Sequence, residues 1–282
     1  CVKMLIESKI LQEAKLIRFL EPNLNFRTNQ TYNINDALEG IQNYGPYDYN
    51  NNERDFENIH IILITPDDST IKHKALQLIK YLEEGFGRYY KGFSTFFRLK
   101  EVIFPTSSDE IITYSPNNED AISHNLIDEA PLSQKPRDTI YVVVAVGNDF
   151  KGLADTKNYY KLKSVCLRLG YPIQYLSNYK DPNVSYAGLI HKMNNRSEFP
   201  YALWNFCVGI YAKAGGIPWI LMNPNEVDVS IGIRFARKKT GGFTTGFVSI
   251  FDQFGMYKGF YTEKFEDSRY GLTKFDFKYD SN

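Results

Sequence analysis

Four residues in the second half of the chain have side chains suited to holding a phosphorylated ligand. Tyr159 and Lys163 are four residues apart in a segment of helical periodicity, so they share one face of the expected helix. Because a helix N-terminus favours an anion, a ring and an ammonium near it would form a stacking platform beside a phosphate. Gln174 follows in the next expected strand, and Lys213 ends a later helix. Taken singly, each is better explained as a structural or solvated residue than as a functional one.

The elements that position these residues alternate between strand and helix. Short apolar or β-branched runs predict buried strands, and glycine and proline mark the ends of the helical segments. This order predicts a parallel α/β sheet of Rossmann-like type, whose ligands collect at the carboxyl ends of the strands, within reach of Gln174. We expect strands at 59–65, 102–104, 140–146 and 172–176, and helices at 70–86, 118–129, 156–169 and 200–214.

The chain divides into three regions by its texture. Residues 1–57 are irregular and are expected to form a lead-in or linker, and residues 58–214 form the α/β domain. From 215 to 282, three β-rich runs are separated by short turns that contain glycine, which predicts an antiparallel meander. Its strands are expected at 229–236, 243–252 and 257–265.

Composition and charge narrow the function classes. The chain has 282 residues with a formal net charge of zero, so bulk charge predicts no polyanionic partner. The average hides an asymmetry, because 101–140 carries eight acidic and two basic residues whereas 151–213 carries nine basic and three acidic residues. The basic stretch, which contains the four candidate residues, is where an anionic ligand is expected. On charge alone, a solvated lysine-bearing helix face is the better explanation.

Other classes lack support in the residues. No apolar run approaches the roughly 20 residues of a membrane-spanning helix, and the first 20 residues contain no signal-peptide core. Three widely spaced cysteines exclude a disulfide framework and favour a reducing, cytoplasmic location. The four histidines have no ligand spacing, so we predict no protein metal site from them.

In combination, Tyr159-x-x-x-Lys163, Gln174 and the helix ending Lys213-Ala-Gly-Gly resemble the MID domain of Argonaute proteins. That domain grips the phosphorylated 5′ end of a guide strand. The resemblance implies that Tyr159 stacks on the first guide base, that the two lysines neutralise the phosphate and that Gln174 hydrogen-bonds it. Asn205 matches a polar position that touches the guide backbone.

Two further stretches agree with this resemblance. Glu21–Phe26 followed by Gly45–Asp48 is similar to the linker that enters MID in prokaryotic Argonautes. Residues 229–234 and 247–252 are similar to the opening strands of PIWI, an RNase H-like domain. The expected fold class is therefore α/β, with a Rossmann-like MID domain followed by the opening antiparallel strands of an incomplete PIWI domain.

The chain departs from the family pattern at three points. Arg234 stands where slicing members carry the first catalytic Asp, and an arginine repels Mg²⁺. Gly209 stands at the family's second basic position, one turn before Lys213. The chain begins with Cys1 rather than Met and ends at Asn282 after about three PIWI strands, so we expect a fragment or one half of a split protein. An inactive PIWI directly after MID is the pattern of short prokaryotic Argonautes.

The resemblance implies a non-slicing protein that anchors the guide 5′-phosphate for target recognition. The implied partners are a guide RNA or DNA, a complementary target, and an effector protein or the rest of PIWI. The implied cofactor is Mg²⁺ at the guide phosphate, although its usual protein carboxylate is missing here. Three alternatives stay open: an Argonaute nuclease completed by another chain or a missing C-terminal half, a nucleotide-dependent α/β enzyme that uses the loop at Gly147–Gly152, and a scaffold that no longer binds guides.

Overall fold

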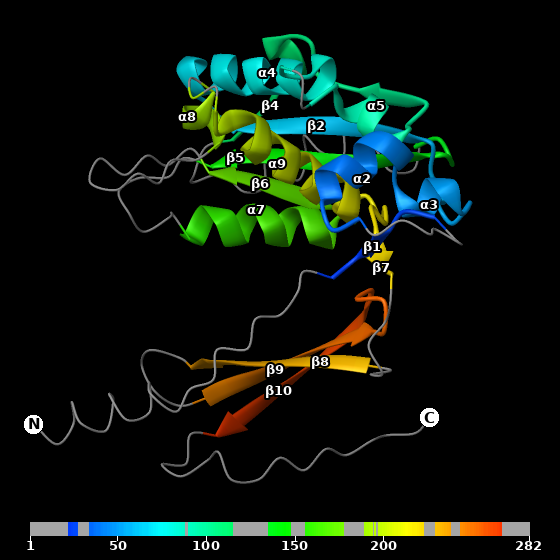
Figure 1. Cartoon of the computed structure of the whole chain (residues 1–282). Coiled ribbons are helices and arrows are strands. Elements are labelled where there is room, and N and C mark those ends of the chain that lie inside the picture. The colour runs from blue at the N-terminus through cyan, green and yellow to red at the C-terminus, as the bar shows by residue number, and fades with distance from the viewer. Residues whose placement is uncertain are drawn as a thin grey trace, which may run out of the picture. The chain divides into compact units, whose positions relative to one another are not determined.

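The computed structural model divides into two compact units, which are described separately (Figure 1). One unit comprises Leu24–Ile220, and the other comprises Cys1–Asn23 with Leu221–Asn282. The structure describes residues 22–27, 34–87, 90–114, 135–147, 156–177, 189–193, 195, 197–222, 229–237 and 243–266. The helix expected at 118–129 and the loop at 148–155 lie outside these ranges.

The first unit is built on a parallel sheet. Its strands run in the order β3-β2-β5-β6, and β4 pairs with β2 beyond β3. The two central strands are almost entirely buried, because their apolar runs do not alternate with polar residues. The predicted parallel α/β sheet is therefore confirmed. Its strands are β2 (Asn58–Pro66), β3 (Glu101–Ile103), β4 (Ile112–Tyr114), β5 (Thr139–Gly147) and β6 (Ile173–Ser177).

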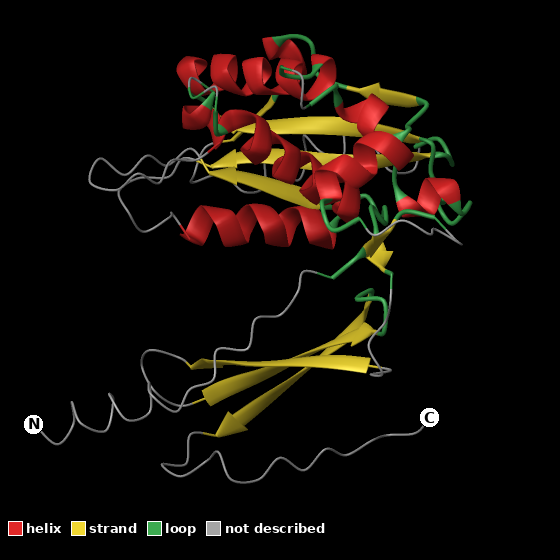
Figure 2. Cartoon of the chain, viewed as in Figure 1, coloured by secondary structure: helices red, strands yellow, loops and turns green. Residues whose placement is uncertain are grey.

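Helices cover both faces of this sheet, with α4 and α7 on opposite sides (Figure 2). Helix α4 begins where the Asp68 carboxylate accepts the backbone N–H groups of Thr70 and Ile71, and it ends at Gly85. The described helices are α2 (Ala37–Tyr44), α3 (Tyr47–Asn50), α4 (Ser69–Glu84), α5 (Phe93–Phe97), η1 (Ser108–Glu110), α7 (Thr156–Arg168), α8 (Leu189–Lys192) and α9 (Phe199–Lys213). None in the described ranges is long and apolar enough to cross a membrane.

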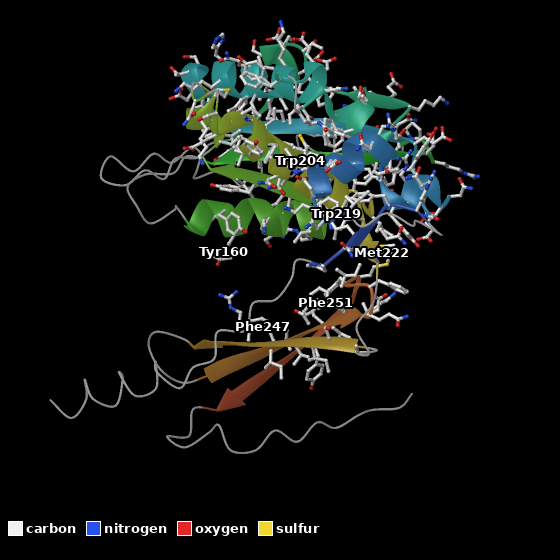
Figure 3. The ribbon with its side chains drawn as sticks, viewed as in Figure 1. Tyr160, Trp204, Trp219, Met222, Phe247 and Phe251 are labelled. Atoms are coloured by element: carbon white, nitrogen blue, oxygen red, sulfur yellow. The ribbon has the colours of Figure 1, made fainter. Side chains whose placement is uncertain are left out.

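The packing of α7 and α9 matters most for the candidate site. Apolar residues of α7 pack on β2 and β5 in one buried cluster, which contains Leu162, Val165, Cys166, Ile64 and Val143. Helix α9 is buried along most of its length, and its Trp204 packs against Phe96 and Phe97 of α5 (Figure 3). Both helices are thus fixed to the sheet by extensive apolar contact.

Residues before β2 also belong to this unit. Phe26 and Ile41 are fully buried, and β1 (Leu24–Asn25) pairs with β7 (Ile220–Leu221). The compact unit thus runs from Leu24 to Ile220, whereas the sequence places the domain at 58–214. The difference arises because α2 and α3 are short and contribute only a few buried residues each, so their local pattern indicates no packed domain.

The described part of the second unit is an antiparallel sheet in the order β10-β9-β8. This is the predicted meander, formed by β8 (Val229–Arg237), β9 (Phe243–Asp252) and β10 (Tyr257–Glu266). The turn between β9 and β10 is closed by the Asp252 carboxylate, which accepts the backbone N–H groups of Phe254 and Met256. Lys258 pairs with the same carboxylate at 2.9 Å.

Candidate functional site

Helix α7 brings an aromatic ring and an ammonium group together. The Nζ atom of Lys163 lies 4.6 Å from the centroid of the Tyr159 ring, as their spacing of four residues predicts. Both side chains are half-buried. The neighbouring Tyr160 is 65% exposed and points away from the sheet (Figure 3), so α7 offers two adjacent tyrosines in different environments.

A tyrosine of strand β6, Tyr175, packs against the Tyr159 ring. The Tyr175 ring meets it edge to face, with centroids 4.8 Å apart and planes at 89°. Tyr175 in turn needs Gly147 at the end of β5, because a Cβ atom there would overlap the Tyr175 hydroxyl. Neither residue was singled out from the sequence as part of the site. The position of Tyr175 next to Gln174 is the one signal that points to it.

Helix α9 and strand β6 bring the other two predicted residues into contact. The Lys213 ammonium donates a hydrogen bond to Oε1 of Gln174, and Gln174 Nε2 donates a weaker one to the Tyr175 carbonyl at 3.4 Å. Gly209 lies one turn before Lys213, and a Cβ atom there would be 3.2 Å from Gln174 Oε1. The glycine at this position therefore leaves room for the amide of Gln174.

A charge interaction links the part of the site on α7 to the part on α9. Partial burial lowers the pKa of Lys213, and the positive charge of Lys163 lowers this pKa further. The two ammonium groups, one on α7 and one on α9, are therefore close enough to repel each other. An anion between them would relieve this repulsion, and the Gln174 amide lies beside it as a hydrogen-bonding group.

The remaining predicted residues lie elsewhere. Asn205 is exposed on α9, two turns before Lys213, and no contact among the described residues joins it to the other four. Arg234 is exposed on β8, opposite Phe247 of β9, and it belongs to the second unit. Within the described ranges, no three His, Cys, Asp or Glu residues gather in a way that would hold a metal ion.

Comparisons with known proteins agree with this fold. No protein-family model matches the chain. The protein argonaute of Cereibacter sphaeroides (strain ATCC 17025 / ATH 2.4.3) is 23% identical over 233 residues, which make up 78% of this chain and 28% of that protein. Clostridium butyricum Argonaute, solved with a guide DNA and a 19-mer target DNA, has a TM-score of 0.55 at 19% identity over 84% of this chain and 29% of its own.

A second solved structure gives the same result. Marinitoga piezophila Argonaute, in complex with a 5′-hydroxyl guide RNA and target DNA, has a TM-score of 0.50 at 10% identity over 90% of this chain and 36% of its own. The chain therefore has an Argonaute-like α/β fold. More particularly, it resembles the MID/PIWI-like part of prokaryotic Argonautes, as the sequence motifs predict. It spans under a third of the C. sphaeroides and C. butyricum proteins and just over a third of the M. piezophila protein.

Proposed function

We propose that this chain binds the phosphorylated 5′ end of a guide RNA or DNA and holds the guide for recognition of a complementary target. The observation that carries the proposal is the approach of two lysines from different helices, Lys163 and Lys213, beside the Gln174 amide and the Tyr159 ring. The similarity to Argonautes solved with guides and targets supports the guide-binding and target-binding part of the proposal.

Each residue has a distinct part in this mechanism. The two ammonium groups neutralise the terminal phosphate. The attraction of each ammonium group to a phosphate between them outweighs their mutual repulsion. Gln174 hydrogen-bonds a phosphate oxygen when Lys213 turns from it toward the ligand. Tyr159 stacks on the first base, while Tyr175 keeps its ring upright. Asn205 contacts the guide backbone farther along α9.

A Mg²⁺ ion at the guide phosphate is the cofactor that the family resemblance implies. The protein ligands of Mg²⁺ are oxygen atoms, chiefly those of carboxylates. Two lysines, one glutamine and one tyrosine supply no carboxylate, so these four residues do not fit a dedicated Mg²⁺ site. Guide binding by the lysines is therefore expected to persist when divalent cations are chelated.

We further propose that the chain acts by binding and does not cleave the target. By the family resemblance, the exposed Arg234 stands where slicing Argonautes carry their first catalytic Asp. A two-metal site needs a carboxylate there, and a guanidinium opposes the cation. A partner effector protein would then carry the downstream response. Target cleavage with Mg²⁺ or Mn²⁺ that is abolished by chelation would instead favour the nuclease alternative.

The decisive experiment compares short RNA and DNA guides that carry either a 5′-phosphate or a 5′-hydroxyl, at one fixed salt concentration, because phosphate contacts make affinity salt-dependent. Lys163→Ala should weaken binding of the phosphorylated guide by about 1–3 kcal/mol, the scale of a hydrogen bond to a charged group. Lys161→Ala removes the same charge from another face of α7 and should leave the phosphate preference unchanged. Equal affinity of the wild type for both ends would contradict the proposal.

The stacking role of Tyr159 has its own test. Tyr159→Ala should cost about 1–3 kcal/mol with a normal guide and much less with a guide that lacks its first base. Tyr160→Ala should cost less and equally with both guides, because this exposed ring meets Tyr159 only edge to face, with centroids 5.1 Å apart. An equal loss with both guides for Tyr159→Ala would show that Tyr159 contributes to folding and not to stacking.

A further inference from the structure

A buried carboxylate holds the chain around Lys213 from two sides. Asp48 of α3 is only 1% exposed. Its Oδ1 accepts the Tyr211 hydroxyl at 2.6 Å and the Tyr49 N–H at 2.8 Å, and its Oδ2 accepts the Ile217 N–H at 2.9 Å. Tyr211 lies two residues before Lys213 and Ile217 lies four residues after it. The two oxygens of one side chain thus bracket the turn that ends α9.

Backbone contacts add to this bracket. The N–H of Tyr47 donates to the Pro218 carbonyl at 3.0 Å, and the N–H of Asp48 donates to the Ile217 carbonyl at 3.3 Å. The N–H of Gly216 returns to the Tyr211 carbonyl at 3.0 Å, and a Cβ atom at Gly216 would overlap the Tyr211 ring. The turn is therefore closed tightly against the same tyrosine that donates to Asp48.

The Tyr211 side chain is itself held in one position. Its ring stacks on Phe97 with centroids 4.2 Å apart and planes at 12°. Arg54 donates to its hydroxyl at 3.3 Å and to the carbonyl groups of Phe97 and Arg98 at 2.8 and 3.0 Å. These contacts act together with the Asp48–Tyr211 bond, so Tyr211 and the last turn of α9 have little freedom to move.

The charge of Asp48 is compensated locally. Burial raises the pKa of its carboxyl, while the bonds from Tyr211 and Ile217 and the nearby Arg54 lower it. A buried carboxylate is tolerated only when its oxygens are hydrogen-bonded, and here three donors supply those bonds. Loss of the Ile217 N–H bond would leave Oδ2 unpaired, whereas loss of the Tyr211 hydroxyl would leave Oδ1 with the Tyr49 N–H alone.

We propose that Asp48 is a positioning residue for Lys213, which directs the lysine ammonium to Gln174 and to the anion bound beside it. The proposal rests on the proposed function, because Lys213 is taken to hold the guide phosphate. It assigns a binding role to the Gly45–Asp48 segment, which sequence similarity alone marks as a linker. Asp48 itself does not touch the ligand.

The test compares guide binding by Asp48→Asn and Tyr211→Phe, each with 5′-phosphate and 5′-hydroxyl guides. Asp48→Asn replaces an acceptor that faces the Ile217 N–H, and it should lower the phosphate preference by about tenfold, the effect of one lost hydrogen bond to a charged group. Tyr211→Phe keeps the ring stacked on Phe97 and removes only the hydroxyl, so a smaller fall of the same kind is expected. Asp68→Asn makes the same charge change at the cap of α4 and should leave the preference unchanged.

The outcomes separate positioning from folding. Circular dichroism and denaturant unfolding of each variant measure stability, and binding of the 5′-hydroxyl guide measures general competence. If Lys213→Ala lowers the phosphate preference whereas Asp48→Asn and Tyr211→Phe keep it, Asp48 is only structural and the inference is overturned. If Asp48→Asn fails to fold, Tyr211→Phe decides the matter alone. If the wild type shows no phosphate preference, the proposed function fails first and this inference fails with it.

Discussion

The two sheets of this chain treat their apolar residues in opposite ways. In the first unit, β2 and β5 are buried on both faces, and Ile64 and Val143 have no more than 1% of their surface exposed. In the second unit, Ile231 of β8 is 59% exposed and Phe260 of β10 is 68% exposed. The apolar residues of the first sheet are buried by the helices that pack on it. The described strands of the second are joined chiefly by their own ladder of pairs.

The register places several apolar residues of the second sheet on one face. Ile231 pairs with Ile250, and Ile233 pairs with Val248, which also pairs with Tyr261. Directly paired residues point to the same side, so these five side chains share one surface. Burial supplies most of the stability of a domain, and the free energy of folding is therefore concentrated in the first unit. The candidate site lies on the unit whose described strands are buried.

The largest predicted effect breaks this contrast directly. Ile64→Ala should lower the free energy of unfolding of the first unit by about 2–5 kcal/mol, because it leaves a cavity in a closed core. Ile231→Ala removes the same atoms from an exposed site and should change stability by about 0.5 kcal/mol or less. Denaturant unfolding followed by circular dichroism measures both. Similar losses would show that the second sheet has a core of its own.

A pair of glycines sharpens the contrast at the level of single atoms. Gly147→Ala in β5 forces a Cβ atom into the Tyr175 hydroxyl and should cost about 1–3 kcal/mol, the usual penalty of overpacking. Gly232→Ala in β8 meets only the Ser249 carbonyl oxygen at 3.9 Å and should be neutral or stabilising by about 0.5–1 kcal/mol. Thermal unfolding of the two variants distinguishes these outcomes. If Gly147→Ala leaves the stability unchanged, Tyr175 can move aside. The inference that Tyr175 holds the Tyr159 ring in place would then be wrong.

The smallest predicted effect concerns the charge of Lys213. Because its pKa is lowered by burial and by Lys163, its ammonium loses its proton at a lower pH than that of an ordinary lysine. The preference for a 5′-phosphate should therefore fall as the pH rises through the pKa of Lys213. Lys163→Gln removes the repulsion, so the Lys213 titration, followed by NMR of its side-chain Hε signals, should move to higher pH. An unchanged midpoint would mean that the two ammonium groups do not interact.

Local sequence was sufficient for the elements that carry the site. The apolar run at 140–146 predicts a buried strand and the spacing at 156–169 predicts a helix, and both appear within one or two residues of the expected ends. The short strand β4 and the helices α2 and α3 are not predicted, although the equally short strand β3 is, so local pattern does not identify short elements dependably. Tyr159 and Lys163 lie on one face of a single helix, so their spacing alone predicts the contact between the ring and the ammonium group.

Tertiary structure alone decided the rest of the site. The contact of Lys213 with Gln174 joins residues 39 positions apart, and the bond between Asp48 and Tyr211 joins residues 163 positions apart. Neither follows from local pattern, because each depends on how α3, β6 and α9 pack around the sheet. The same holds for Gly209, which reads as a lost basic residue in the sequence and in the fold makes room for the Gln174 amide. Sequence determined which groups are present and on which elements, whereas packing determined which of them meet, because distances across a fold are set by long-range contacts.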